Sequence, residues 1–315
     1  MHELITILGP TACGKTAVAT QLAARLPAAE IISADSRQVF RGMDIGTGKD
    51  LSDYEVEMTV NGKPQRCHIP YHLIDIADAG TKYSVFDFQR DFLKAYNDIC
   101  RRQAQPILCG GTGLYIESVL RAYKLVEVPV NPTLRERLEH KPLEELTKIL
   151  ASYKRLHNTT DVDTARRAIR AIEIEEFYRE HHVEEMQPFP AIPSLTIGLN
   201  LPRELRRQRI SARLHQRLDK EGMVDEVRAL LDSGVPAEAL ISYGLEYRYL
   251  TLYLTKQMTY DDMVSQLEIA IHQFAKRQMT YFRGMERRGV NIHWIDATRS
   301  TDDIITDIIS SLHKE

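Results

Sequence analysis

The first twenty residues constrain the fold more than any other stretch of the chain. The apolar run Leu4-Ile5-Thr6-Ile7-Leu8 leads into Gly9-Pro10-Thr11-Ala12-Cys13-Gly14-Lys15-Thr16, and a segment with apolar residues at helical spacing follows. The octapeptide fits the pattern G-x-x-x-x-G-K-[ST] at every fixed position. In such a loop, backbone amides and the positive end of the next helix converge on one anion. The lysine adds a charge and the hydroxyl is a ligand for Mg²⁺. The sequence therefore predicts a strand, a phosphate loop over residues 9–16 and a helix.

Length and composition narrow the class of protein. A chain of 315 residues has room for two domains, or for one domain with an insertion. No stretch approaches the roughly 18 consecutive apolar residues of a membrane span. Its four cysteines lack metal-ligand spacing, and the first strand begins without a signal peptide before it. We therefore expect a cytoplasmic protein with free thiols and no membrane partner.

Two further strands are predicted to end at the edge of the sheet where the phosphate loop lies. The strand Glu30-Ile31-Ile32-Ser33 precedes Asp35-Ser36-Arg37-Gln38, and Pro106-Ile107-Leu108-Cys109 runs into Gly110-Gly111-Thr112-Gly113. The carboxyl ends of parallel strands share one edge, where ligands bind. Asp35 is thus expected to face the phosphate, although a loop carboxylate also often caps a turn. A third strand within residues 69–76 ends at Asp75, which could hold a metal-bound water.

Strands alternate with helices along most of the chain. Helices are expected over residues 83–102, 114–121, 203–220, 223–231, 261–283 and 301–312, and the last strand over residues 290–296. This alternation predicts an α/β fold with an open parallel sheet and helices on both faces, like that of P-loop NTPases. Residues 124–190 show helices without a convincing strand, one of them capped by Asp161. We predict an inserted all-helical domain there, between core segments 1–123 and 191–315.

Basic residues are clustered although the net charge is −3. Six arginines fall between Arg203 and Arg217, and Arg166, Arg167 and Arg170 form another group. Such clusters are compatible with a nucleic-acid partner, and each is also compatible with an ordinary solvated helix face.

Eight segments occur in an order that resembles one family. They are GPTACGKT, ISADSRQVFRGMDIGTGK, YHLID, YSVFDF, GGTGLYI, RISARL followed by GMVDEV, and AKRQMTYFRG. Together they are similar to the tRNA dimethylallyltransferase family, also called tRNA isopentenyltransferases. The resemblance runs from the first strand to about Gly284 and is less patterned between residues 124 and 190.

The resemblance implies that a dimethylallyl group passes from dimethylallyl diphosphate to the exocyclic amine of the adenosine immediately 3′ of the anticodon. Asp35 matches the general base of the family. Thr11, Lys15 and Thr16 would bind the diphosphate, with Mg²⁺ held partly by Thr16. Arg213, in RISARL, matches an arginine that assists at the same end.

The resemblance also implies how RNA is bound. The adenosine must be flipped into a pocket to reach the donor. Asp35, Ser36, Arg37 and Gln38 would line the adenine channel, and Thr112 would contact the RNA. The insertion would grip the anticodon stem-loop, with Arg166, Arg167 and Arg170 as candidate contacts, and we expect a monomer.

The chain departs from the family pattern at two places. Ser242-Tyr243-Gly244-Leu245-Glu246-Tyr247-Arg248 stands where the family commonly has GYRQ or GYKE, and Gly46-Thr47-Gly48-Lys49-Asp50 stands for GTAKP. The first segment helps the family to recognise the anticodon loop, so the set of accepted tRNAs stays open. We expect no C-terminal zinc-finger extension like that of eukaryotic members, which fits a bacterial cytoplasmic enzyme.

Three alternatives stay open at this point. An adenylate isopentenyltransferase would use free AMP, ADP or ATP and would need no RNA grip. A small-molecule kinase would use the same phosphate loop for ATP. A paralogue could bind RNA without catalysis, although Asp35, Lys15, Thr16 and Arg213 are all present.

Overall fold

The contacts within the chain divide it into two units. The computed structural model describes residues 4–60, 63–156, 160–182 and 188–312. One unit comprises Met1–Ala122 and Pro190–Glu315, and the other comprises Tyr123–Phe189. In the part of the chain that the structure describes, no helix is both long and apolar enough to cross a membrane.

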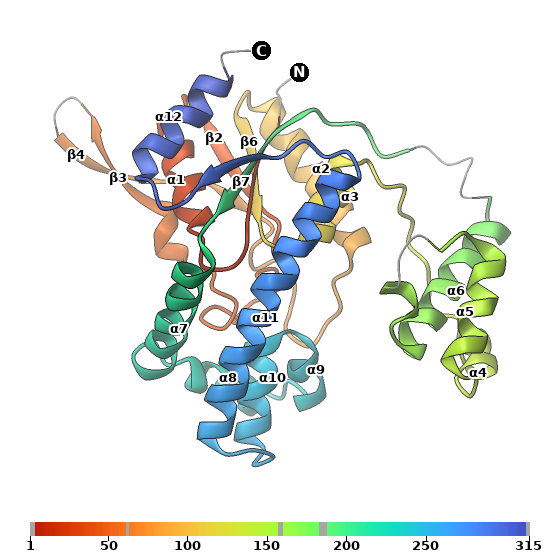
Figure 1. Ribbon diagram of the computed structural model, residues 1–315. Helices are drawn as coiled ribbons and strands as arrows, with labels where there is room; N and C mark the ends of the chain where they lie inside the picture. Colours follow the sequence, from red (N-terminus) through yellow and green to blue (C-terminus); the bar gives the residue numbers. More distant parts are fainter. Residues whose placement is uncertain (1–3, 61–62, 157–159, 183–187, 313–315) are drawn as a thin grey trace. The chain divides into compact units, whose positions relative to one another are not determined.

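A parallel sheet of six strands forms the centre of the first unit (Figure 1). Its strands lie in the order β5-β2-β6-β1-β7-β8, and all neighbouring pairs are parallel. Their bounds are β1 (Leu4–Leu8), β2 (Ala29–Ser33), β5 (Tyr71–His72), β6 (Gln105–Gly110), β7 (Ser194–Asn200) and β8 (His293–Asp296). Because β7 pairs directly with β1, the sheet resumes after residues 123–189. The predicted α/β fold with a parallel sheet is confirmed.

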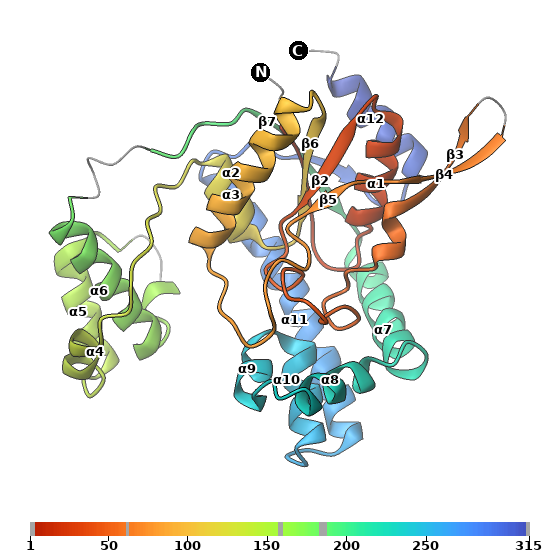
Figure 2. The same cartoon turned by 180° about the vertical axis from the view of Figure 1, so that it is seen from behind.

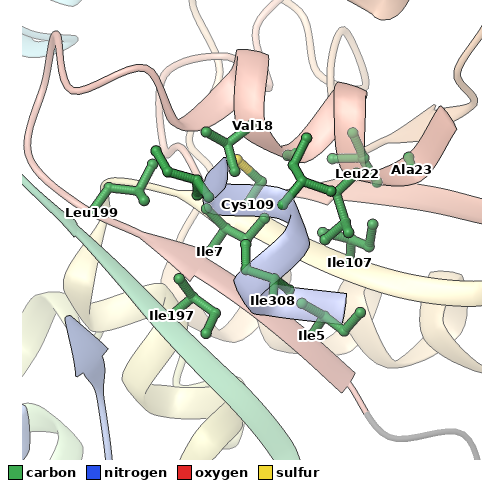
Figure 3. Close-up of a cluster of buried hydrophobic side chains, with 14 of the residues drawn as sticks. Ile5, Ile7, Val18, Leu22, Ala23, Ile107, Cys109, Ile197, Leu199 and Ile308 are labelled. Atoms are coloured by element: carbon green, nitrogen blue, oxygen red, sulfur yellow. The ribbon is translucent and has the colours of Figure 1, made fainter. Parts of the chain in front are cut away.

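Helices cover both faces of this sheet, as Figures 1 and 2 show. The helices α1 (Lys15–Arg25) and α12 (Thr301–Leu312) pack on one face, and α2 (Val85–Arg101) and α3 (Gly113–Leu120) lie on the other. In Figure 3, Ile5 and Ile7 of β1 meet Val18 and Leu22 of α1 and Ile308 of α12. All five residues of β1 are buried, as expected for a strand covered on both faces.

Five helices from the second half of the chain build another hydrophobic cluster beside the loop that follows β2. They are α7 (Arg203–Asp219), α8 (Met223–Asp232), α9 (Ala237–Ser242), α10 (Leu245–Leu254) and α11 (Tyr260–Arg287). Val39, Phe40 and Met43 from that loop are buried against Tyr247 of α10 and Leu267 of α11. The C-terminal half of the chain thereby fixes a loop from the N-terminal half.

Residues 51–76 contain a hairpin and a shorter strand than expected. A 3₁₀ turn (Leu51–Tyr54) precedes the antiparallel strands β3 (Glu55–Val60) and β4 (Lys63–His68). The strand predicted within residues 69–76 is reduced to two residues in β5. Leu73 and Asp75 adopt positive φ of 62° and 56°, a left-handed conformation that ends an extended strand.

The second unit contains helices and no strand among its described residues. It contains α4 (Pro132–Leu138), α5 (Leu143–Tyr153), a 3₁₀ turn (Thr160–Val162) and α6 (Ala165–Glu180). Leu146 and Leu150 of α5 pack with Ala168 and Ile172 of α6 in its core. The prediction that Asp161 caps α6 was wrong. Asp161 lies in the 3₁₀ turn, and the Thr164 hydroxyl accepts the hydrogen bond from the backbone N–H of Arg167 at 3.3 Å.

Candidate active site

Three loops meet at the carboxyl ends of neighbouring strands. Because β6 lies between β1 and β2, the phosphate loop, the residues after β2 and the glycine turn after β6 are adjacent. They enclose a cavity of about 130 Å³. The sequence-predicted residues on its wall are Thr11, Ala12, Gly14, Lys15, Thr16, Asp35, Arg37, Gln38 and Arg213. The edge of the sheet that was expected to bind a ligand therefore carries a polar cavity.

The phosphate loop has the backbone conformation that an anion cradle needs. Ala12 and Gly14 adopt positive φ of 63° and 87°, and α1 begins at Lys15 without an acidic residue in its first turn. The Lys15 ammonium donates to the Pro10 carbonyl at 2.9 Å, which holds it over the loop. The Thr16 side chain lines the cavity, and its hydroxyl makes no hydrogen bond to any residue that the structure describes. The loop thus offers backbone amides, an ammonium and a hydroxyl to a ligand.

Close packing behind the loop explains its small residues. A Cβ atom at Gly9 would lie 2.7 Å from the Leu199 carbonyl oxygen and 2.8 Å from the Cys13 sulfur. Cys13 is buried, and Cys109 at the end of β6 lines the cavity. Burial raises the pKa of the Cys109 thiol to about 12, so this thiol stays protonated and is a poor nucleophile.

The two carboxylate oxygens of Asp35 differ in their hydrogen bonding. Its Oδ1 accepts a hydrogen bond from the backbone N–H of Arg37 at 3.0 Å. Within the described chain its Oδ2 has no partner, and the side chain is 20% exposed on the cavity wall. A carboxylate that is oriented through one oxygen leaves the other to accept a proton.

The loops after β2 and β6 are joined to each other. The Thr112 hydroxyl accepts from the backbone N–H of Ser36 at 3.0 Å, and the Thr112 N–H donates to the Ala34 carbonyl at 3.1 Å. A Cβ atom at Gly110 would lie 2.3 Å from the Ala34 oxygen, so glycine is required for this approach. Ser36 and Thr112 therefore stand beside Asp35 but outside the wall of the cavity, and their contact with RNA stays a prediction.

Gln278 of α11 bridges two of the loops, and sequence reasoning did not single it out. Its Oε1 accepts from the backbone N–H of Thr11 at 2.9 Å, and its Nε2 donates to the Gly111 carbonyl at 3.0 Å. The side chain is buried and lines the cavity. The only signal in the sequence was its place in the segment AKRQMTYFRG.

Arg37 connects Asp35 to the segment that departs from the family pattern. Its Nη1 lies 2.8 Å from Glu246 Oε2 and its Nε lies 3.7 Å from Asp35 Oδ1, while the guanidinium stands over the Phe274 ring. Burial alone would lower the pKa of Arg37, because it disfavours the charged guanidinium. The Glu246 and Asp35 carboxylates together have the larger effect and raise the pKa. A Cβ atom at Gly244 would lie 2.8 Å from Arg37 Cδ. Gly244 and Glu246 therefore set the position of an arginine beside Asp35.

Arg213 enters the cavity from α7 beside a second arginine. Its Nη2 lies 3.3 Å from Asp50 Oδ2, and Arg217 Nη2 lies 3.0 Å from Asp50 Oδ1. Burial and the neighbouring Arg217 charge lower the pKa of Arg213. Gly48, at φ 67°, leaves room for it, because a Cβ atom there would lie 2.1 Å from Arg213 Nη2. Arg217 also pairs with Glu221 at 3.8 Å, whereas Asp50 is the one ion-pair partner of Arg213 among the described residues, so an additional anion would be favoured beside Arg213.

The loop that carries Gly48 is anchored by a buried lysine. Lys49 Nζ donates to the Phe40 carbonyl at 2.7 Å and to Asp44 Oδ1 at 2.6 Å, and it also pairs with Asp75. Asp75 is therefore not on the cavity wall, and the expectation that it holds a metal-bound water is replaced by a structural role. Gln38 is fixed in the same region, because its Nε2 donates to the Gly48 carbonyl at 2.9 Å.

Glu226 of α8 holds the preceding turn and was not identified from the sequence. Its carboxylate accepts from the backbone N–H groups of Asp44, Ile45 and Gly46 at 2.8, 2.7 and 3.0 Å. It also accepts from the buried Tyr247 hydroxyl at 2.6 Å. Glu226 is part of the segment GMVDEV. That segment therefore supplies the carboxylate that fixes the turn over residues 44–46.

The three arginines predicted to bind RNA differ in their environments within the helical unit. Arg170 pairs with the buried Glu173, and its Nη2 donates to the Val128 carbonyl at 2.8 Å. Arg167 pairs with Asp163 at 3.0 Å on the surface. Arg166 is exposed and has no ion pair with any described residue. Arg166 is thus the most available of the three to a partner.

Comparisons with known proteins identify the family. A model of the IPP transferase family matches residues 38–285, and a model of isopentenyl transferases matches residues 2–61. tRNA dimethylallyltransferase 1 of Parabacteroides distasonis is 62% identical over 314 residues, which cover 100% of this chain and 99% of that protein. tRNA dimethylallyltransferase 2 of Phocaeicola vulgatus is 61% identical, over 99% and 98% of the two chains. The chain belongs to the tRNA dimethylallyltransferase family.

Solved structures of tRNA dimethylallyltransferases share its fold. The full-length tRNA isopentenylpyrophosphate transferase of Bacillus halodurans is 30% identical, with a TM-score of 0.69 over 100% of this chain and 96% of that one. A eukaryotic dimethylallyltransferase acting on tRNA has a TM-score of 0.76 at 22% identity, which is a likeness of fold. The resemblance drawn from eight sequence segments is confirmed, and the chain is an enzyme of this family.

Proposed function

We propose that this enzyme transfers a dimethylallyl group from dimethylallyl diphosphate to the exocyclic amine of the adenosine immediately 3′ of the anticodon in tRNA, releasing diphosphate. The observation that carries the proposal is one cavity with the phosphate loop on one side and the free Oδ2 of Asp35 on another. The relatives that are about 60% identical over the whole chain support the same reaction.

The diphosphate is bound by the phosphate loop. Backbone amides of Ala12 and of Gly14 to Thr16, with the Lys15 ammonium, surround the group that leaves, and Arg213 adds a second cation from α7. Negative charge grows on the diphosphate as its bond to carbon breaks. Donors that are already in place stabilise this charge without further reorganisation. The partly desolvated guanidinium of Arg213 suits that role, because burial strengthens its interaction with an anion.

The adenosine is activated at Asp35. The amine nitrogen forms a bond to C1 of the dimethylallyl group while the bond between C1 and the diphosphate oxygen breaks. The nitrogen becomes acidic as it gives up its electron pair, and its proton passes to Asp35 Oδ2. The backbone N–H of Arg37 keeps Oδ1 in place during this transfer. Asp35 is the general base in this proposal.

A magnesium ion fits the cavity at Thr16. The Thr16 hydroxyl is on the wall and unpaired among described residues, while no cluster of three acidic, histidine or cysteine side chains is found there in the described chain. Mg²⁺ bound to phosphates typically takes only one or two protein oxygens. When bound, the ion would neutralise charge on the diphosphate. Thr16 is the residue that we propose to hold it.

RNA reaches the cavity as a flipped base. Asp35, Ser36, Arg37 and Gln38 form the side of the adenine channel, and Thr112 contacts the RNA beside it. Bases in an unpaired loop can be turned out of the stack at modest cost. In this proposal the helical unit grips the anticodon stem-loop through Arg166, Arg167 and Arg170. The enzyme acts as a cytoplasmic monomer, in the compartment that contains its tRNA.

The proposal is tested with labelled dimethylallyl diphosphate and the purified full-length protein, offered unmodified tRNA or AMP. We expect label in tRNA and none in AMP. Label in AMP alone would identify an adenylate isopentenyltransferase. ATP turnover without transfer of label would identify a kinase, and tRNA binding without transfer would identify an RNA-binding paralogue.

A further inference from the structure

A second cavity lies between α7 and α11, two helices that lie side by side in the first unit (Figure 1). Its volume is about 300 Å³, more than twice that of the candidate active site. Arg203, Arg206 and Arg207 of α7 line one side, and His272 and Lys276 of α11 line the other. No part of the proposed reaction uses these residues, so the cavity needs its own explanation.

The positive charges around this cavity are not neutralised. Arg206, Arg207 and Lys276 have no ion pair among the residues that the structure describes, and the carboxylate nearest to Arg203, that of Glu204, is 4.0 Å away on the surface. Burial lowers the pKa of Arg206, and the charges of Arg203 and Arg283 lower it further. Like charges held together in a partly buried site are favourable only when an anion joins them.

A buried polar atom without a hydrogen-bond partner in the described chain belongs to His272, one of the residues that line this cavity. This atom is the ring nitrogen Nδ1. The other ring nitrogen, Nε2, lies 3.4 Å from the Ser211 hydroxyl and 3.5 Å from Glu268 Oε1. Buried polar atoms are nearly always paired, so a missing partner points to a ligand or a water. This observation is independent of the arginine cluster.

We propose that this cavity is a second phosphate-binding site, separate from the phosphate loop. Guanidiniums bind phosphate oxygens in pairs, and three of them with one ammonium match the charge of a phosphate or diphosphate group. This inference rests on the proposed function, under which the phosphate comes from one of two sources. It belongs to the tRNA backbone, or to a free diphosphate moving to or from the active site. The second source is consistent with the geometry, because Ile210 lines this cavity and also a small hollow that reaches Thr11, Ala12 and Arg213.

The test compares the double variant Arg206→Gln, Lys276→Gln with Lys220→Gln. Lys220 is an exposed cation just after the end of α7 and does not line the cavity. One measurement is the stoichiometry of inorganic diphosphate binding by calorimetry. The other is tRNA affinity as a function of salt, whose logarithmic slope falls by about 1 for each lost phosphate contact. An Arg206→Lys variant keeps the positive charge. It should therefore retain part of the diphosphate binding, or part of the salt slope, that the double variant loses.

The two sources give different results. If the site takes free diphosphate, the double variant binds one equivalent where the unmodified protein binds two, and its tRNA slope is unchanged. If it takes the RNA backbone, the tRNA slope falls by about 1–2 while the diphosphate stoichiometry is unchanged. A double variant that behaves like Lys220→Gln in both assays would overturn the proposal. Neither assay requires turnover, so a failure of the transfer reaction would be seen separately.

Discussion

The chemistry proposed for this enzyme rests on the two oxygens of Asp35. The backbone N–H of Arg37 fixes Oδ1, and Oδ2 is left without a partner among the described residues. The phosphate loop contributes no bond to this carboxylate. Proton acceptance and diphosphate binding can therefore be altered separately.

We predict that Asp35→Asn lowers kcat by about 10²–10⁴-fold, the usual effect of losing a general base. Binding of dimethylallyl diphosphate should be nearly unchanged, because the contacts that we propose for it come from the phosphate loop and Arg213. Single-turnover transfer and equilibrium binding of the donor measure the two effects. A variant with near-normal kcat would show that Asp35 is not the base.

The sequence identified the residues of the site whose contacts are local. The phosphate loop and Asp35 follow directly from strands and turns in the chain. Gln278 and Glu246 could not be found in this way, because they meet Thr11 and Arg37 across 267 and 209 residues. Only the folded chain shows that amide and carboxylate side chains from α10 and α11 hold the loops of the sheet.

At the scale of elements, the loop after β2 depends on a buried ammonium. Lys49 is fully buried and has three oxygen partners, from Phe40, Asp44 and Asp75. Through the same loop, Gly48 borders Arg213 and Gln38. The geometry of one wall of the cavity therefore depends on an ion-pair network outside it.

Asp75→Ala should destabilise the protein by about 1–3 kcal/mol, because it removes a partner from a buried charge. Asp78→Ala is the matched control, since Asp78 and its partner Arg41 are both exposed and such pairs contribute about 0–1 kcal/mol. Urea unfolding of both variants measures the difference. Equal stability of the two variants would mean that the Lys49 network does not hold the loop.

The sequence predicted helices and strands correctly where the pattern of apolar residues is long and uninterrupted. The helix over residues 301–312 was predicted with the bounds that α12 has in the structure. The helices α9 and α10 were missed, since each is short and they are separated by Gly244, whose φ is 155°. The strand β5 was overestimated because the left-handed conformations of Leu73 and Asp75 leave no trace in an apolar pattern.

At the scale of the whole molecule, the helical unit has a charged centre of its own. Glu173 is only 1% exposed and accepts from Arg135 Nη2 at 2.8 Å, from Arg170 and from the Asn131 N–H at 2.7 Å. Burial alone would raise the pKa of Glu173, but these hydrogen bonds outweigh it and lower the pKa. Arg170 therefore stabilises the unit whether or not it also contacts RNA.

This network predicts an acid-sensitive unit. Because folding lowers the pKa of Glu173, its stabilising contribution is present above the ordinary value and is lost as pH falls below about 4.5. The protection factors of the α6 amides in the full-length protein, which correct for the slower intrinsic exchange in acid, should therefore fall between about pH 5 and pH 3. Glu173→Gln should exchange faster at neutral pH and change less with acid. Glu180→Gln, an exposed position on the same helix, should behave like the unmodified protein.

The central claim is that the acceptor is the amine of one adenosine in an anticodon loop. The direct measurement is transfer of labelled dimethylallyl diphosphate to two anticodon stem-loop RNAs. One carries adenosine 3′ of the anticodon and the other carries inosine, which lacks the exocyclic amine. We predict one dimethylallyl group on the adenosine RNA and none on the inosine RNA. Equal labelling of both RNAs, or labelling of neither while AMP is labelled, would contradict the account.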